Sequence, residues 1–202
     1  MPESRRPLTS RDTRWAKALS GALARRGVTP NAISVAGMIF ASIGALGLAA
    51  TPCGCVPWTL GMVLGVAGAQ LRLLCNLLDG MVAIEGGLKG KAGDLFNEAP
   101  DRLADIVLLV GAGYAAGAPW LGWMAASAAV LTAYVRAFGA SVGQGQDFCG
   151  PLAKPHRMFF FSVGCLGAIA HPPALAWSLW LVAIGAFFTA ARRVVRLYRK
   201  LP

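Results

Sequence analysis

Six apolar segments dominate the chain, and their lengths approach what an α-helix needs to cross a lipid bilayer, about 20 residues. We expect these spans at residues 32–50, 56–78, 102–118, 120–140, 157–170 and 174–191. An open sheet edge cannot satisfy its backbone groups in lipid, so the spans must be helices. The sequence therefore predicts an all-α integral membrane protein with six transmembrane helices.

The composition agrees with this class. Of the 202 residues, 56% are hydrophobic and 14% are charged, and the mean hydropathy is +0.57. The five cysteines are scattered; only Cys53 and Cys55 lie close together, and a single C-x-C lacks the second ligand pair of a zinc site. We expect these cysteines to be structural or incidental. The first 30 residues lack the apolar core of a cleavable signal peptide.

The positive charge is concentrated at the two ends of the chain. The net charge is +10, with seven Lys and Arg residues in 1–27 and five more in 192–200. The short loops between spans one and two, three and four, and five and six carry no Lys or Arg. This bias indicates attraction to membrane lipids rather than to nucleic acid, and it places basic segments in the cytoplasm. We expect a bacterial inner-membrane protein with both termini and the candidate active site on the cytoplasmic side.

Residues 9–26 predict an amphipathic helix on the membrane surface, because apolar residues share one face among basic ones. That face consists of Trp15, Ala18, Leu19, Ala22 and Leu23. We divide the chain into an N-terminal helix and linker (1–31), a six-helix catalytic domain (32–192) and a basic tail (193–202).

Polar residues gather between the second and third spans. Asn76 and Asp79 are three apart on one predicted helix, and Asn97, Asp101 and Asp105 are four apart on the next. Each set lines one helical face, and the glycine-rich turn between them allows both faces to meet. Oxygen ligands of this kind suit hard cations such as Mg²⁺ or Mn²⁺. The alternative is a solvated loop, with Asp94 as a simple helix cap.

The stretch Asn76–Asp101 resembles the signature of the CDP-alcohol phosphotransferase family, D-x2-D-G-x2-A-R-x8-G-x3-D-x3-D, with its spacing preserved throughout. The residues that match it are Asp79, Gly80, Ala83, Gly93 and Asp101. Further likeness lies in "VTPN" at 28–31, "DRLAD" at 101–105 and "YVRA" at 134–137. The resemblance covers about residues 10–192.

The resemblance implies an enzyme that moves a substituted phosphoryl group from CDP-diacylglycerol, or a similar CDP-alcohol, to a small polar alcohol, releasing CMP. It implies a homodimer and a Mg²⁺ or Mn²⁺ site. The residues at the metal positions are Asn76, Asp79, Asn97 and Asp101. Asp101 would also be the base that activates the acceptor hydroxyl. Small residues let a backbone approach closely, so Gly80, Ala83 and Gly93 would border the nucleotide.

Three positions depart from the signature: Asn76 and Asn97 replace Asp, and Ile84 replaces Arg. Asn still offers an oxygen ligand, but without charge. We therefore expect either one tightly bound ion in place of the two that the family pattern holds, or compensation by another carboxylate. The candidates for compensation are Glu85, Asp94 and Asp105.

Several basic residues are candidates for binding phosphate. Arg136, Lys154 and Arg157 are predicted to bind the acceptor or a phosphate, against an alternative in which they only set topology. Arg72 and Arg102 either neutralise local carboxylates or reach a phosphate. We interpret Pro100 as marking the start of the third span, against an alternative in which it lies inside a helix, kinks it and re-aims Asp101.

Two other functions remain open on the sequence alone. A non-catalytic relative would bind a nucleotide lipid or a membrane partner without turnover, and the three departures are what such a protein shows. A transporter is disfavoured, since spans one to three carry few charges away from their ends apart from Arg72. The acceptor alcohol is not fixed by the sequence.

Overall fold

The computed structural model describes residues 13–85 and 91–201, apart from the side chains at 85 and 91–97. Within that part the fold is entirely helical. Its helices are α1 (Arg14–Arg25), α2 (Pro30–Ala49), α3 (Trp58–Glu85), α4 (Lys91–Ala115), α5 (Pro119–Ser141), α6 (Lys154–Ala170) and α7 (Pro173–Tyr198). The all-α prediction is confirmed for these residues.

Prolines and glycines set the helix boundaries. Pro30, Pro119 and Pro173 stand in the first turn of α2, α5 and α7, where a missing backbone N–H costs nothing. Gly27 and Gly117 follow α1 and α4 with φ of 71° and 68°, a left-handed conformation that side chains disfavour. The expected breaks between spans therefore arise from residues suited to ending or starting a helix.

Each predicted span coincides with one helix from α2 to α7. Four of these helices are long and apolar enough to cross a membrane: α2, α3, α5 and α7. The chain is thus an integral membrane protein. α6 has only 17 residues, and α4 opens with a charged segment. The count of six crossings therefore stays a prediction.

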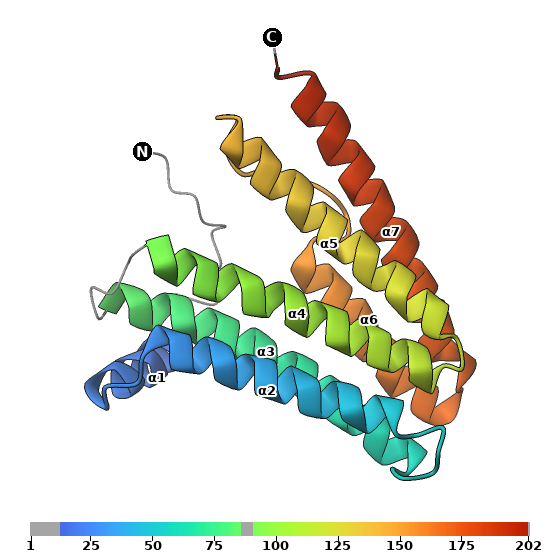
Figure 1. Ribbon diagram of the computed structural model, residues 1–202. Helices are drawn as coiled ribbons and strands as arrows, with labels where there is room; N and C mark the ends of the chain where they lie inside the picture. Colours follow the sequence, from blue (N-terminus) through green and yellow to red (C-terminus); the bar gives the residue numbers. More distant parts are fainter. Residues whose placement is uncertain (1–12, 86–90, 202) are drawn as a thin grey trace.

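The helices run up and down in a bundle, with α2, α3 and α4 side by side and α5 beside α7 at an angle to them (Figure 1). The turns at 50–57, 116–118 and 171–172 lie at one end of the bundle and contain no Lys or Arg. The opposite ends of α3, α5 and α7 lie away from these turns. This separation agrees with the charge bias in the sequence, and the cytoplasmic side remains a prediction.

The close approach of α2 and α3 depends on glycine. A Cβ atom on Gly68 would lie 2.6 Å from the carbonyl oxygen of Phe40 and 3.0 Å from Cα of Gly44. Both neighbours are backbone atoms, which cannot move without shifting a helix. Small residues of this kind let membrane helices pack through their backbones.

We expect Gly68→Ala to destabilise the protein, because the added methyl overpacks this contact, at a cost of about 1–3 kcal/mol. The matched control is Gly167→Ala in α6, whose Cβ would meet only Ala174 Cβ at 3.4 Å. Both changes gain the same helix propensity. Thermal unfolding in detergent measures the difference, and equal midpoints for the two variants would refute this account.

α1 packs against α3 and does not lie apart from the other helices. Ala16 packs with Leu77 and Met81, while Trp15 and Leu19 remain exposed. The exposed pair can face lipid headgroups, as expected of an amphipathic surface helix. Residues 9–12 of the predicted helix lie outside the described residues.

The interpretation of Pro100 is wrong. α4 begins at Lys91, so Pro100 lies inside the helix. The ion pair between Glu98 and Arg102, at 2.7 Å, spans the proline along the same helix. The charged start of the helix precedes the apolar span, and the sequence pattern marks only the apolar part.

Candidate functional site

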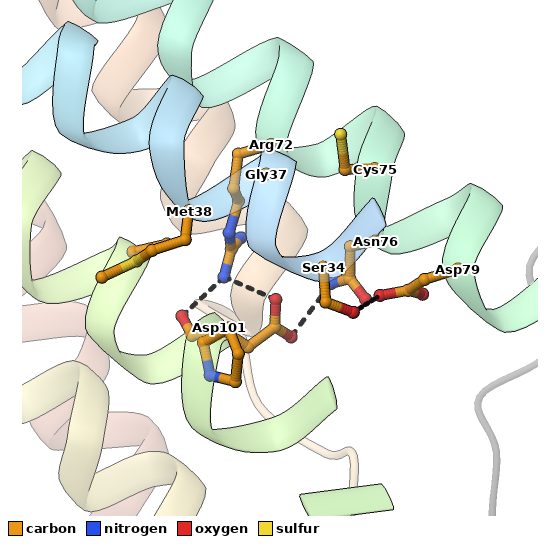
Figure 2. A pocket seen from close by; sticks show the side chains of 10 residues that line it. Ser34, Gly37, Met38, Arg72, Cys75, Asn76, Asp79 and Asp101 are labelled. Carbon is orange, nitrogen blue, oxygen red and sulfur yellow. Dashed lines mark hydrogen bonds and ion pairs between the residues drawn. The ribbon is translucent and has the colours of Figure 1, made fainter. Parts of the chain in front are cut away.

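A small pocket opens where α2, α3 and α4 meet (Figure 2). Its lining residues are Ser34, Gly37, Met38, Arg72, Cys75, Asn76, Asp79, Pro100, Asp101 and Ala104. The structure thus brings three of the four predicted metal ligands to one place. The side chain of the fourth, Asn97, lies outside the described residues.

Asp101 has partners on both carboxylate oxygens. Oδ2 accepts a hydrogen bond from Nδ2 of Asn76 at 3.0 Å and also contacts the Lys154 ammonium. Oδ1 pairs with the Arg72 guanidinium at 3.0 Å. α4 therefore meets α3 through Asn76 and Arg72, and α6 through Lys154.

Asp79 differs, because one of its oxygens is free. Oδ2 accepts a hydrogen bond from Ser34 Oγ at 2.7 Å, whereas Oδ1 is buried without a hydrogen-bond partner in the described part of the chain. The residue is only 4% exposed. A buried, unpartnered carboxylate oxygen is costly unless a cation or water satisfies it.

Arg72 lies 2% exposed at the back of the pocket, one turn before Asn76. One terminal nitrogen reaches Oδ1 of Asp101 at 3.0 Å, the carbonyl oxygen of Asp101 at 2.7 Å and Oδ1 of Asp105 at 2.8 Å. Of the two interpretations given for Arg72, neutralising carboxylates is the one that these contacts support.

Arg157 is also turned inward. Its guanidinium pairs with Oδ2 of Asp105 at 3.0 Å and donates to Thr132 Oγ1 at 3.1 Å and to the carbonyl oxygen of Leu152 at 3.2 Å. It is 1% exposed. Asp105 is thereby held between two arginines, so it is not free to replace a missing metal ligand. The predicted acceptor role of Arg157 has no contact here that supports it and stays a prediction.

Arg136 belongs to a second cluster, on the α4–α5 side. Its guanidinium contacts the carboxylate of Glu98, which also pairs with Arg102, and lies 5.5 Å from the ring centre of Phe148. Burial raises the pKa of Glu98, but the two arginines outweigh it and hold that pKa below its usual range. The contact between Glu98 and Arg136 could not be predicted from local spacing, because the two residues lie 38 apart in the chain.

Of the predicted nucleotide-binding residues, Gly80 and Ala83 do not line the pocket. Gly80 is buried and Ala83 half-buried on α3, one and two turns beyond Asn76. Ile84, at the position of the signature Arg, is exposed. The surroundings of Gly93, and the side chains of Glu85 and Asp94, lie outside the described residues.

The donor set fits one hard divalent cation better than two. No group of three or more His, Cys, Asp or Glu that could hold a metal occurs among the residues whose placement is described. What the pocket does offer is the free Asp79 oxygen beside the Asn76 amide. Carboxylate and carboxamide oxygens are ligands that Mg²⁺ and Mn²⁺ accept.

Relatives by sequence extend over most of the chain, although no protein-family model matches it. The phosphatidylinositol phosphate synthase of Mycobacteroides abscessus is 26% identical over 201 residues, covering 93% of this chain and 86% of that protein. Inner membrane protein YnbA of Escherichia coli is 26% identical over 135 residues, covering 61% and 63%.

Solved structures share the fold. The crystal structure of Mycobacterium tuberculosis phosphatidylinositol phosphate synthase (PgsA1) with CDP-DAG bound matches with a TM-score of 0.78 at 21% identity, covering 92% of this chain and 94% of that one. The same enzyme in complex with manganese and citrate matches with a TM-score of 0.74 at 22% identity, covering 91% and 88%.

The signature spacing, the near full-length relative and the shared fold agree with one another. The matched signature residues Asp79 and Asp101 also meet in one pocket, as the family pattern requires. The chain is therefore similar in sequence and fold to phosphatidylinositol phosphate synthases, and its signature resembles that of the CDP-alcohol phosphotransferase family.

Proposed function

We propose that this protein transfers a phosphatidyl group from CDP-diacylglycerol, or a similar CDP-alcohol, to the hydroxyl of a small polar alcohol and releases CMP. The observation that carries the proposal is the pocket in which Asp79 and Asp101 lie together at signature spacing. The sequence relative named as a phosphatidylinositol phosphate synthase supports the reaction class.

The transfer makes one bond and breaks one. The acceptor oxygen attacks the phosphorus that carries the lipid, the bond from that phosphorus to the CMP oxygen breaks, and CMP leaves with the electron pair. Asp101 takes the acceptor proton as general base. An oxygen of Asp101 must first be freed, and Lys154 is the partner able to move, since its side chain is 18% exposed. The incoming diphosphate offers the ammonium an alternative anion.

A bound Mg²⁺ or Mn²⁺ would neutralise charge on the diphosphate and stabilise the transferring group. The described residues that would hold it are Asp79 and Asn76, with Asp101 and Asn97 as the further predicted ligands. Gly80, Ala83 and Gly93 remain the proposed neighbours of the nucleotide.

The acceptor is proposed to bind on the side of Lys154 and Arg136, whose positive charges would attract an anionic group. An inositol phosphate is the first acceptor to try, because the relative is named for a phosphatidylinositol phosphate product. We also propose that the protein is a homodimer in the bacterial inner membrane, with six spans and with the pocket and both termini facing the cytoplasm.

The test is CMP release by the purified protein in detergent, with CDP-diacylglycerol, Mg²⁺ or Mn²⁺, and a pool of small alcohols that includes inositol phosphate. We expect CMP only when an acceptor is present, and dividing the pool then identifies that acceptor. CMP formed equally without any acceptor would indicate hydrolysis and contradict a transferase.

The second candidate is a non-catalytic relative that binds a nucleotide lipid or a membrane partner. The observation that favours it is the pairing of Asp101 with two cations, together with Asn76 and Asn97 in place of carboxylates. CDP-diacylglycerol binding without CMP release, under either metal and with every acceptor, would support this candidate over the enzyme.

A further inference from the structure

We infer that Arg72 is a built-in cation that neutralises the Asp101 end of the pocket, so that the site takes one divalent ion, at Asp79. This rests on the proposed function only in that the ion would serve the substrate diphosphate. The number of ions bound and their position are properties of the resting protein and need no turnover.

Arg72 supplies a positive charge that is fixed in place. The Arg72 guanidinium lies within 3.0 Å of carboxylate oxygens of both Asp101 and Asp105. It is 2% exposed, so water screens it little. Arginine does not lose its proton in proteins. A positive charge is therefore permanently present at this end of the pocket.

The carboxylate of Asp101 is already occupied by protein donors. Both oxygens of Asp101 already meet donors, from Arg72 on one side and from Asn76 and Lys154 on the other. A metal ion there would have to displace Lys154 and would still lie beside the guanidinium. Like charges at that distance repel strongly in a buried site.

Asp79 offers a ligand oxygen for the metal ion. Asp79 is 4% exposed, and its Oδ1 has no hydrogen-bond partner among the described residues. Ser34 holds the other oxygen at 2.7 Å and fixes the carboxylate against α2 (Figure 2). The pocket's unsatisfied negative charge therefore lies at Asp79, one turn from the Asn76 amide.

The charges of the four groups also balance without metal. Asp79 and Asp101 supply two negative charges, and Arg72 and Lys154 supply two positive ones. A single dication bound at Asp79 makes this neutral site positive, which suits the negatively charged diphosphate of the substrate. Two dications would leave the site strongly positive, beside an arginine that cannot leave.

The experiment is a titration of the purified protein in detergent with Mn²⁺, in which electron paramagnetic resonance counts free and bound ions. We expect one ion per chain in the wild type. Arg72→Met removes the fixed cation, so we expect either a second bound ion or a dissociation constant lower by about tenfold or more. The control is Arg102→Met, which removes the same charge from an arginine paired with Glu98 at 2.7 Å, outside the pocket lining.

Two carboxylate variants keep the inference testable if Arg72→Met does not fold. Asp79→Asn should abolish Mn²⁺ binding, whereas Asp101→Asn should retain the single ion. Two equally tight ions in the wild type would overturn the inference, as would binding lost with Asp101→Asn but kept with Asp79→Asn. One ion at Asp79 without CMP release would leave the inference standing and defeat the proposed transferase; CMP release with two ions would do the reverse.

Discussion

Replacing Asp101 with Asn is expected to lower CMP release by about 10²–10⁴-fold, the usual contribution of a general base. The amide keeps the shape of the side chain and can still contact Asn76, but it cannot take the acceptor's proton. Binding of CDP-diacylglycerol should be largely retained, because the free oxygen of Asp79 is untouched. The measurement pairs initial rates of CMP release with equilibrium binding of the CDP-lipid.

The control for Asp101→Asn is Asp147→Asn. Asp147 is a carboxylate paired with Arg196 at 3.2 Å and does not line the pocket. It should turn over at the wild-type rate. Unfolding midpoints of both variants exclude a general loss of structure, since Asp101→Asn also removes the charge that faces Arg72 and Lys154. Wild-type turnover by Asp101→Asn would rule out the base assignment.

The helices could be predicted from the sequence because apolar runs and their breakers are local features. Gly27, Pro30 and Gly117 mark ends and starts whatever the helices pack against. The start of α4 escaped prediction because its first turns are charged, and Pro100 looked like a boundary. Inside the helix, the Glu98–Arg102 pair spans that proline, a contact that spacing permits but does not require.

The site was predictable where its residues share a helix and not where they meet across helices. Asn76 and Asp79 are spaced so that they share one face of their helix. Asp101 lies on a face of the next helix. Ser34 was missed because it reaches Asp79 from α2, 45 residues earlier. Which way a buried arginine points depends on the rotation and depth of neighbouring helices. That is why the pairing of Arg157 with Asp105 could not be predicted, while its acceptor role stays a prediction.

Several contacts fix the position of α6, which begins at Lys154. Trp58 Nε1 donates to the carbonyl oxygen of Ala168 at 2.8 Å, and Gln70 Nε2 donates to Ser162 Oγ at 2.9 Å, so α6 is tied to α3 along its length. Arg193 of α7 holds the preceding loop through the carbonyl oxygen of Cys149 at 2.8 Å. The ammonium is therefore brought to Asp101 by tertiary packing, which no local pattern encodes.

Asp105→Asn is expected to cause the largest loss of stability among single changes near the site. Asp105 is 1% exposed and pairs with Arg72 at 2.8 Å and Arg157 at 3.0 Å. Without its charge, two buried guanidiniums face each other with no carboxylate between them. Breaking a buried ion pair by removing one partner typically costs about 3–5 kcal/mol. Reversible unfolding in mixed micelles measures this cost as a change in the free energy of unfolding.

The double variant Asp105→Asn, Arg157→Met separates an unpaired charge from a simple loss of packing. It removes one of the two guanidiniums, so it should be more stable than Asp105→Asn alone if uncompensated positive charge is the cause. Arg157→Met by itself leaves Asp105 paired with Arg72 and should cost less than Asp105→Asn. Strictly additive losses would mean that the two side chains do not interact energetically, and the buried network would then not hold α4 against α3 and α6.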